Sequence, residues 1–205
     1  MKLYVASTSP FGRKASITIA ELGLESRVRQ EPATVTPVTR NEEVARDNPL
    51  GKIPTLVLDD GSTLFDSPVI CEYLDSLSGE PRFFPQSGPA RWSALRWQAL
   101  ADGLMDAAIL LRYEQALRPE PLRWADWIAG QQAKMTAALD AFEADAPLFG
   151  EGFDIGHVAI ACALGYLDLR FGHLEWRNGR PALAAWFAKV SERPSLISTF
   201  PKVST

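Results

Sequence analysis

Residues 2–14 of the sequence, KLYVASTSPFGRK, decide how the fold begins. The largely apolar residues 2–6 predict a short strand. Ser9 followed by Pro10 is typical of a helix start, because a hydroxyl accepts hydrogen bonds from the free N–H groups of the first turn and proline suits the first helical position. We therefore predict a strand that leads through a hydroxyl-rich turn into a helix ending near Leu22.

The following residues continue this alternation of strands and helices. We expect a weak strand at 27–30, a short helix at 41–46, strands at 54–58 and 63–65 around an Asp-Asp-Gly turn, and a helix at 68–77. The order β-α-β-(α)-β-β-α within about eighty residues predicts a small α/β domain.

The pattern changes at residues 79–89, which contain three prolines and two glycines. Such a stretch breaks both helix and strand, so we expect a linker there. We expect only helices beyond it, at 90–111, 124–145, 155–169 and 181–190, with a short one before Pro201. We expect the tryptophans at 124, 127 and 186 to be buried. The predicted organisation is an α/β domain over 1–78, a linker over 79–89 and an all-α domain over 90–205.

Composition excludes several classes of protein. The 205 residues carry a formal net charge of −4. The chain therefore has no excess of basic residues to neutralise phosphates, which argues against a nucleic-acid partner. Cys71 and Cys162 stand far apart, which argues against a disulfide scaffold or a thiolate metal site and fits a reducing compartment. The apolar run at residues 158–167 is too short to span a bilayer, and the N-terminus lacks a targeting pattern. We therefore expect a cytoplasmic protein with no membrane partner and no metal.

The turn at Ser7-Thr8-Ser9-Pro10-Phe11 is the first candidate for chemistry. Where a strand leads into a helix, the first backbone N–H groups of the helix are free. These groups and the helix dipole both favour the binding of an anion. A hydroxyl at this point can donate to a thiolate and lower the pKa of a bound thiol. The simpler interpretation, which the turn taken alone favours, is that Ser9 only caps the helix.

The second candidate is Gly51-Lys52-Ile53-Pro54-Thr55. If the bond before Pro54 is cis, the backbone N–H and C=O of Ile53 could pair with a peptide-like ligand, as an added strand would. An ordinary trans proline at the start of an edge strand is the alternative.

The third candidate is Phe65-Asp66-Ser67-Pro68. The N–H and hydroxyl of Ser67 suit a ligand carboxylate and Asp66 suits an ammonium, and an amino-acid moiety has both groups on one carbon. The alternative is a plain helix cap with Pro68 at the first helical position.

These segments, in this order, make the chain resemble the glutathione S-transferase superfamily over essentially its full length. The matching segments are residues 9–14 (SPFGRK), 48–54 (NPLGKIP) and 65–70 (FDSPVI). The chain is most similar to bacterial members with a Ser-Pro-Phe turn. The resemblance implies a thioredoxin-like N-terminal domain, an all-α C-terminal domain, glutathione as co-substrate and a homodimer.

The resemblance also implies roles for residues. Ser9 would face the glutathione sulfur, and Phe11 would line the cleft. Ile53, before a cis Pro54, would bind the cysteinyl backbone. Asp102 would reach the ligand amine across the dimer, although a half-buried aspartate paired with an arginine is an equal alternative. For the two ends of the tripeptide, the γ-glutamyl group would be held by Asp66 and Ser67, and the glycyl carboxylate would lie near Lys52.

Two departures from the family pattern stand out. The capping box expected at the helix near Val158 has His157 where the family has a carboxylate, so we expect His157 not to return a hydrogen bond to the cap. Ser9 also stands where some classes have cysteine, so no mixed disulfide with the enzyme can form. The sequence thus predicts a transferase that activates the glutathione thiol for attack on a small electrophile. A glutathione-dependent reductase of disulfides or peroxides, and a non-enzymatic interaction module, are the alternatives.

Overall fold

The computed structural model describes residues 1–79 and 82–201. By its packing the chain divides into two compact units. The first consists of Met1–Trp92 with the described residues from Arg193 onward, and the second of Ser93–Glu192. Residues 80 and 81 of the expected linker lie outside the described residues, and the predicted domain limits stay predictions.

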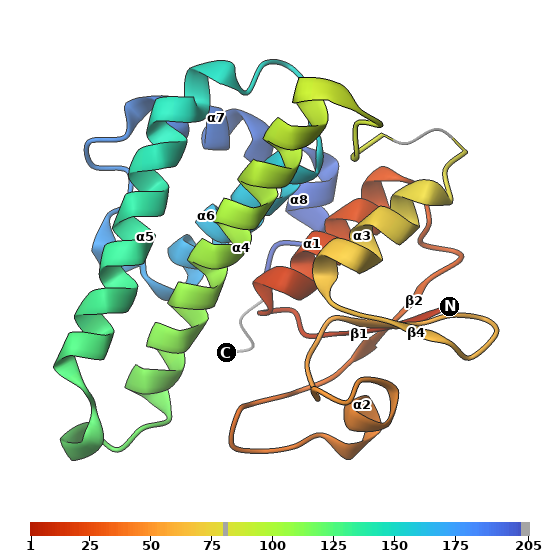
Figure 1. Cartoon of the computed structure of the whole chain (residues 1–205), viewed down its shortest axis with the longest axis horizontal. Coiled ribbons are helices and arrows are strands. Elements are labelled where there is room, and N and C mark those ends of the chain that lie inside the picture. The colour runs from red at the N-terminus through yellow and green to blue at the C-terminus, as the bar shows by residue number, and fades with distance from the viewer. Residues whose placement is uncertain (80–81, 202–205) are drawn as a thin grey trace. The chain divides into compact units, whose positions relative to one another are not determined.

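The first unit contains the α/β part of the chain (Figure 1). Its elements are β1 (Lys2–Val5), α1 (Pro10–Glu21), β2 (Arg29–Pro32), α2 (Glu42–Asp47), β3 (Thr55–Val57), β4 (Thr63–Leu64), α3 (Ser67–Ser76) and α8 (Pro194–Ser198). The sheet has the order β2-β1-β3-β4, with β1 parallel to β2, antiparallel to β3, and β4 antiparallel to β3. This is the thioredoxin-like arrangement that the family resemblance implied. The first edge strand is displaced by two residues, since β2 lies at Arg29–Pro32 and not at 27–30, and the other predicted elements differ by one residue at one or both ends.

Helix α1 begins where the sequence predicted. Ser9 is its N-cap, Pro10 occupies the first helical position, and Leu22 is its C-cap. The helix also lies close to β1, because a Cβ at Gly12 would come within 2.6 Å of Cγ2 of Val5. Glycine at position 12 therefore allows the hydroxyl-rich turn to pack tightly against the strand that precedes it.

The last helix packs with α1 in the first unit. The guanidinium of Arg193 donates to both carboxylate oxygens of Glu21, at 2.9 and 2.7 Å, and Ser195 Oγ donates to the same carboxylate at 2.5 Å. Arg13 of α1 donates to the backbone oxygen of Leu196 at 3.0 Å. These contacts fix the C-terminal segment to the helix that carries Ser9.

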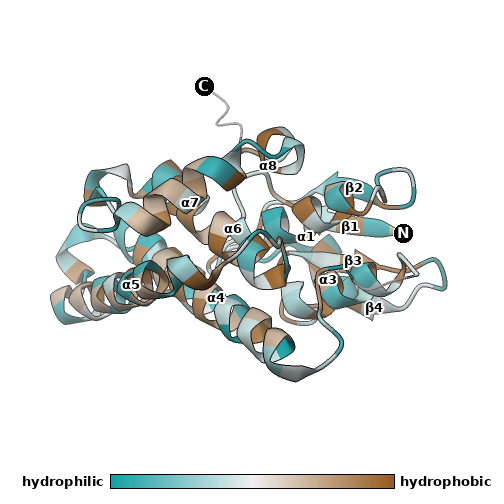
Figure 2. Cartoon of the chain, turned by 90° about the horizontal axis from the view of Figure 1, so that it is seen from above, coloured by the Kyte–Doolittle hydropathy of each residue, from teal (hydrophilic) through white to brown (hydrophobic). Residues whose placement is uncertain are grey.

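The second unit is helical in all of its described secondary structure. It contains α4 (Gly88–Ala116, from Ser93 on), α5 (Ala125–Asp145), α6 (Ile155–Arg170) and α7 (Pro181–Ser191), joined in part by short 3₁₀ turns. The all-α part predicted by the sequence is confirmed. Helices α4 and α5 alternate between apolar and polar residues (Figure 2), whereas α6 is buried from Ile155 to Leu167. Gly156 permits this burial, because a Cβ there would lie 2.8 Å from the backbone oxygen of Ala94.

The capping box of α6 corrects an expectation. Asp154 Oδ1 accepts from the backbone N–H of His157 at 3.2 Å, and His157 Nδ1 accepts from the N–H of Asp154 at 3.1 Å. The box is therefore complete, because a neutral ring nitrogen accepts this hydrogen bond as a carboxylate would. The other ring nitrogen lies 3.0 Å from the oxygen of Phe149.

The burial of tryptophans differs from expectation at the start of α5. Trp124 is 62% exposed and Trp127 is 39% exposed, whereas Trp186 is half-buried. Trp124 is the N-cap residue of α5 and so stands at the end of the helix, where neighbouring turns cover little of its ring. Within residues 1–79 and 82–201, no helix is both long and apolar enough to cross a membrane.

Candidate functional site

The pairing of the strands brings the three candidate segments to the same end of the sheet, where β1 ends. Tyr4 of β1 lies opposite Thr55 of β3, so the residues just before Thr55 lie beside the end of β1 that leads to Ser9. Leu56 lies opposite Leu64 of β4, so the residues after β4 reach the same end. The turn before α1, the Ile53–Pro54 bond and the start of α3 therefore converge, although they are up to about sixty positions apart in sequence.

Ser9 combines a capping role with a free donor. Its Oγ accepts from the backbone N–H of Gly12 at 3.1 Å. Pro10 has no N–H, so the donors left at this end of α1 are the Ser9 hydroxyl and the N–H of Phe11. Neither has an acceptor among the described residues. The capping interpretation of Ser9 is thus confirmed, and the cap still leaves two donors for an anion.

The Ile53–Pro54 peptide bond is cis, as the resemblance implied. Its loop is held by Asn48, which is 1% exposed. Asn48 Nδ2 donates to the oxygen of Lys52 at 3.1 Å and to Thr55 Oγ1 at 3.0 Å, and Thr55 Oγ1 donates to the same oxygen at 2.8 Å. The N–H and C=O of Ile53 have no hydrogen-bond partner among the described residues. The loop therefore presents a free backbone donor and acceptor side by side.

Sequence reasoning missed the buried pair of Asn48 and Thr55. Asn48-Pro49-Leu50-Gly51 gives the signal of a turn only. The amide of an asparagine before proline can serve many turns, and its partner seven positions away shows only when the loop is folded.

Two polar side chains at the start of α3 lack the hydrogen bonds expected at a helix N-terminus. Asp66 is the N-cap residue, yet its side chain makes no capping hydrogen bond and is exposed. Ser67 is 1% exposed, and its Oγ is buried without a partner among the described residues. Pro68 again removes one N–H. An orphaned hydroxyl at a helix N-terminus is suited to a carboxylate, and the exposed Asp66 carboxylate is suited to an ammonium group.

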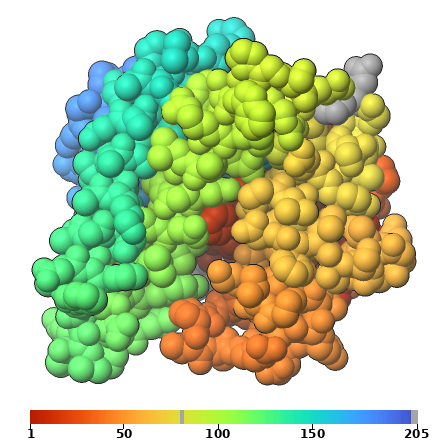
Figure 3. All heavy atoms as spheres, in the orientation of Figure 1, coloured from red at the N-terminus to blue at the C-terminus, as the bar shows by residue number. Residues whose placement is uncertain are grey.

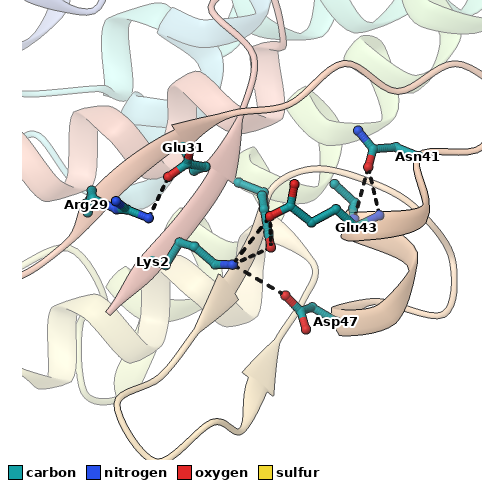
Figure 4. A network of polar contacts seen from close by, with 8 residues as sticks. Lys2, Arg29, Glu31, Asn41, Glu43 and Asp47 are labelled. Carbon is teal, nitrogen blue, oxygen red and sulfur yellow. Dashed lines mark hydrogen bonds and ion pairs between the residues drawn. The ribbon is translucent and has the colours of Figure 1, made fainter.

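Helix α2 is fastened beside this site by a polar network that the sequence did not suggest (Figure 4). The buried Tyr4 hydroxyl accepts from Lys2 Nζ and donates to Glu43 Oε1 at 3.0 Å. Lys2 Nζ also lies 3.8 Å from Asp47. Burial raises the pKa of the Tyr4 hydroxyl, and hydrogen bonding to Glu43 adds to that rise while Lys2 opposes it. The phenol therefore keeps its proton and links β1 to α2.

The network and the Ile53 loop share one apolar cluster. Tyr4, Ala33 and Val44 form its buried part, and the side chain of Ile53 packs against it. Docking of α2 through Val44 therefore bears on the position of the Ile53 backbone.

The remaining predicted site residues lie as follows. Phe11 is half-buried in the first turn of α1, and Lys52 is exposed beside Ile53. Asp102 is half-buried on α4 in the second unit. Within the described part of the chain, no three His, Cys, Asp or Glu side chains gather where they could hold a metal ion. In the space-filling view the red N-terminal segment is visible at the surface beside the gold and orange segments of its own unit (Figure 3).

Comparisons with known proteins find similar sequences over nearly the whole chain. Residues 8–77 match the family model described as glutathione S-transferase, N-terminal domain, and residues 125–189 match glutathione S-transferase, C-terminal domain. The chain is 36% identical over 204 residues to an uncharacterized GST-like protein, YibF, of Escherichia coli (strain K12), and the match covers 98% of both chains.

Solved structures are similar over the same length. A glutathione transferase family member from Pseudomonas fluorescens Pf-5 with bound glutathione has a TM-score of 0.96 at 45% identity, covering 98% of this chain and 99% of that one. The same protein with bound S-(propanoic acid)-glutathione has a TM-score of 0.91 at 44% identity, covering 99% and 100%. A Methylobacillus flagellatus glutathione S-transferase with glutathione bound has a TM-score of 0.87 at 37% identity, covering 98% and 99%.

Proposed function

The chain belongs to the glutathione S-transferase family, and on that premise we propose that it binds glutathione and activates its thiol as a thiolate. The thiol proton passes to solvent, and the thiolate sulfur forms a bond to the electrophilic carbon of a small substrate. The leaving group departs from that carbon with its bonding electrons, as halide does from a halogenated aromatic compound. The observation that carries the proposal is the convergence of three unsatisfied polar groups at one end of the sheet: the Ser9 hydroxyl, the Ile53 backbone and the Ser67 hydroxyl.

Each group fits one part of the tripeptide. The N–H and C=O of Ile53 pair with the cysteinyl backbone in the manner of an added strand. Ser67 Oγ and the N-terminus of α3 receive the γ-glutamyl carboxylate, and Asp66 receives the ammonium group. Lys52 lies near the glycyl carboxylate and Phe11 lines the cleft. Asp102 reaches the ligand amine across the proposed dimer. The glutathione bound to the Pseudomonas fluorescens and Methylobacillus flagellatus neighbours supports glutathione as the ligand.

Activation of the thiol needs little acid–base chemistry from the protein. The Ser9 hydroxyl and the Phe11 N–H donate to the sulfur, and the α1 dipole favours negative charge there. These donors stabilise the thiolate more than the thiol, so they lower the pKa of the bound sulfhydryl. The Ser9 hydroxyl keeps its own proton throughout, because it is a donor and not a base.

Calorimetry combined with two activity assays tests the proposal. We expect saturable heat with glutathione at millimolar concentration or below, and conjugation of glutathione to a halogenated aromatic substrate. Absence of saturable heat would contradict glutathione binding and favour an interaction module. Strong reduction of a disulfide or hydroperoxide without any conjugation would contradict the transferase reaction.

We also propose that the protein is a cytoplasmic homodimer, as family members are expected to be. The first unit has exposed apolar side chains that could pack in a dimer interface: Leu50, Val69 and Trp92. Light scattering on the purified chain should give twice the monomer mass of 22.5 kDa. A mass equal to one chain at micromolar concentration would contradict the dimer.

A further inference from the structure

The peptide group between Lys52 and Ile53 has its two edges in different surroundings. The Lys52 oxygen lies on one edge and the Ile53 N–H on the other. Two side-chain donors meet the oxygen, Asn48 Nδ2 at 3.1 Å and Thr55 Oγ1 at 2.8 Å. The Ile53 N–H has no acceptor among the described residues. The oxygen edge is therefore fixed by the protein, and the N–H edge is left for a ligand.

The two donors are themselves held in place. Thr55 is fully buried and Asn48 is 1% exposed, and Asn48 Nδ2 also donates to Thr55 Oγ1 at 3.0 Å. Asn48 Oδ1 accepts from the N–H of Leu50 at 3.0 Å, and the N–H of Asn48 donates to the oxygen of Val44 at 2.8 Å. The backbone of Thr55 pairs with Tyr4 in the sheet. Neither donor can therefore turn away from the Lys52 carbonyl without losing its other contacts.

Hydrogen bonds to the Lys52 oxygen also set the direction of the Ile53 N–H. The bond between Lys52 and Ile53 is trans, and in a planar trans peptide group the C=O and the N–H point in opposite directions. The N–H therefore points away from Asn48 and Thr55. Hydrogen bonds that a carbonyl accepts also polarise its peptide group, which makes the N–H of that group a stronger donor. The two side chains thus control the direction and the strength of a donor that neither of them contacts.

We propose that Thr55 and Asn48 are positioning residues for glutathione, which aim the Ile53 N–H at the cysteinyl carbonyl of the ligand without touching the ligand themselves. This role rests on the proposed function, because it deepens the part given there to the Ile53 backbone. Glutathione affinity should depend on the Thr55 hydroxyl, whereas the thiol chemistry at Ser9 should not.

Calorimetry with glutathione on two Thr55 variants tests this role. Thr55→Val has nearly the same shape but no hydroxyl, so it loses the hydrogen bond to the Lys52 oxygen and should bind glutathione about fivefold more weakly. Thr55→Ser keeps the hydroxyl and loses a buried methyl group, so it should be less stable than the parent yet bind glutathione within about twofold of it. The pKa of the bound thiol should be that of the parent in both variants, because Ser9 is untouched.

Amide NMR follows the Ile53 N–H directly. Glutathione should move the Ile53 amide proton downfield in the parent and in Thr55→Ser, and by a smaller amount in Thr55→Val. A role of Thr55 in stability alone would not separate the two variants in this way.

Thr18→Val is the matched control in the same unit. Thr18 is fully buried on α1 and its hydroxyl donates to the oxygen of Lys14 at 3.0 Å, so this variant also removes a buried hydroxyl bonded to a backbone carbonyl. Thr18→Val should lose stability as Thr55→Val does, but it should bind glutathione as the parent does.

A second variant keeps the test open if Thr55→Val does not fold. Asn48→Asp retains an acceptor for the N–H of Leu50 but has no donor for the Lys52 oxygen, so it too should bind glutathione about fivefold more weakly.

Parent-like glutathione binding by Thr55→Val, or by Asn48→Asp in its place, would overturn the positioning role and leave the proposed function intact. Equal losses of binding in Thr55→Val and Thr18→Val would also overturn it, because stability alone would then explain both. Absence of saturable heat in the parent would contradict glutathione binding itself, and the positioning role with it.

Discussion

The backbone N–H of Gly12 donates to Ser9 Oγ at 3.1 Å, so the hydroxyl caps α1 as an acceptor and keeps its own proton for another partner. The Ser9 oxygen thus accepts the capping hydrogen bond, while the hydroxyl hydrogen stays available to donate to a ligand. The absent Cβ of Gly12 makes the close approach possible, since it would lie 3.4 Å from Ser9 Oγ and 2.6 Å from Val5 Cγ2.

Replacement of Ser9 by alanine removes both tasks. The lost cap should lower the free energy of unfolding by about 1 kcal/mol. A hydrogen bond to a charged group contributes about 1.5–3 kcal/mol, so the pKa of the bound glutathione thiol should rise by about one to two units. Ultraviolet titration of the thiolate in the complex measures this shift. Ser9→Thr is the control, because it keeps the hydroxyl; an unchanged thiol pKa in Ser9→Ala would refute the donor role.

Replacement of Gly12 by alanine tests the packing of α1 against β1. The added methyl group meets Val5 Cγ2, so we expect a loss of about 1–3 kcal/mol of unfolding free energy in urea titrations. Gly103→Ala on α4 is the control: no atom lies within 4 Å of its Cβ position, and it should be neutral or stabilising. Val5→Ala combined with Gly12→Ala should recover part of the loss. Additive losses in the double variant would show that the clash is elsewhere.

Replacement of Tyr4 by phenylalanine tests whether α2 docking positions the Ile53 loop. The variant loses the hydrogen bonds to Lys2 and Glu43, so the free energy of unfolding should fall by about 1 kcal/mol. Glutathione should bind several-fold more weakly, while the pKa of its bound thiol stays unchanged, because Ser9 is untouched. Calorimetry and thiolate titration separate the two effects. Arg29→Gln, which breaks an exposed pair with Glu31 on the sheet edge, should change neither.

The carboxyl of Glu21 makes stability depend on acid pH. Burial raises its pKa, but the hydrogen bonds from Arg193 and Ser195 and the charges of Arg193 and Arg82 outweigh burial, so the pKa lies below the ordinary value of 4.5. A group whose pKa is lowered on folding stabilises the protein above its ordinary pKa, and that stability is lost as the pH falls through the lowered value.

The parent should therefore exceed Glu21→Gln by about 1–3 kcal/mol in unfolding free energy near neutral pH. The difference should shrink as the pH falls below 4.5, which denaturant titrations at several pH values would show. Glu151→Gln is the control, because its pair with Lys189 is fully exposed and its loss should have a much smaller effect. A difference that stays constant into the acid range would rule out linkage through Glu21.

Local signals in the sequence were sufficient to predict most of the helices and strands of the first unit. Ser9-Pro10 marked the start of α1, and the run of turn residues after β3 marked the hairpin with β4. The sequence motifs also selected Ile53–Pro54 and Ser67, whose backbone and hydroxyl groups prove unsatisfied. These features are local, so residues a few positions apart determine them.

Features that depend on tertiary contact were not predictable. The link from Tyr4 to Glu43 joins residues 39 positions apart, and neither type indicates the other. His157 was judged by the usual chemistry of a capping box, yet its ring turns Nδ1 to the cap and Nε2 toward Phe149, a geometry that only the packed second unit sets. The exposure of Trp124 likewise follows from its place at the helix end and not from its residue type.

Replacement of Ser67 by alanine separates folding from binding by the signs of its two effects. In the free protein the buried Oγ has no partner among the described residues, and a buried hydroxyl without a hydrogen bond costs about 1–3 kcal/mol. Its removal should therefore leave the free energy of unfolding unchanged or raise it. The same hydroxyl is proposed to meet the γ-glutamyl carboxylate, so glutathione should bind about tenfold more weakly or worse. Thermal unfolding without ligand and calorimetry with glutathione give the two measurements.

The control for Ser67→Ala is Ser76→Ala, near the other end of α3. The Ser76 hydroxyl donates to the backbone oxygen of Tyr73, and its loss should leave glutathione binding unchanged. If Ser67→Ala bound glutathione as the parent does, the start of α3 would not be where the ligand carboxylate lies.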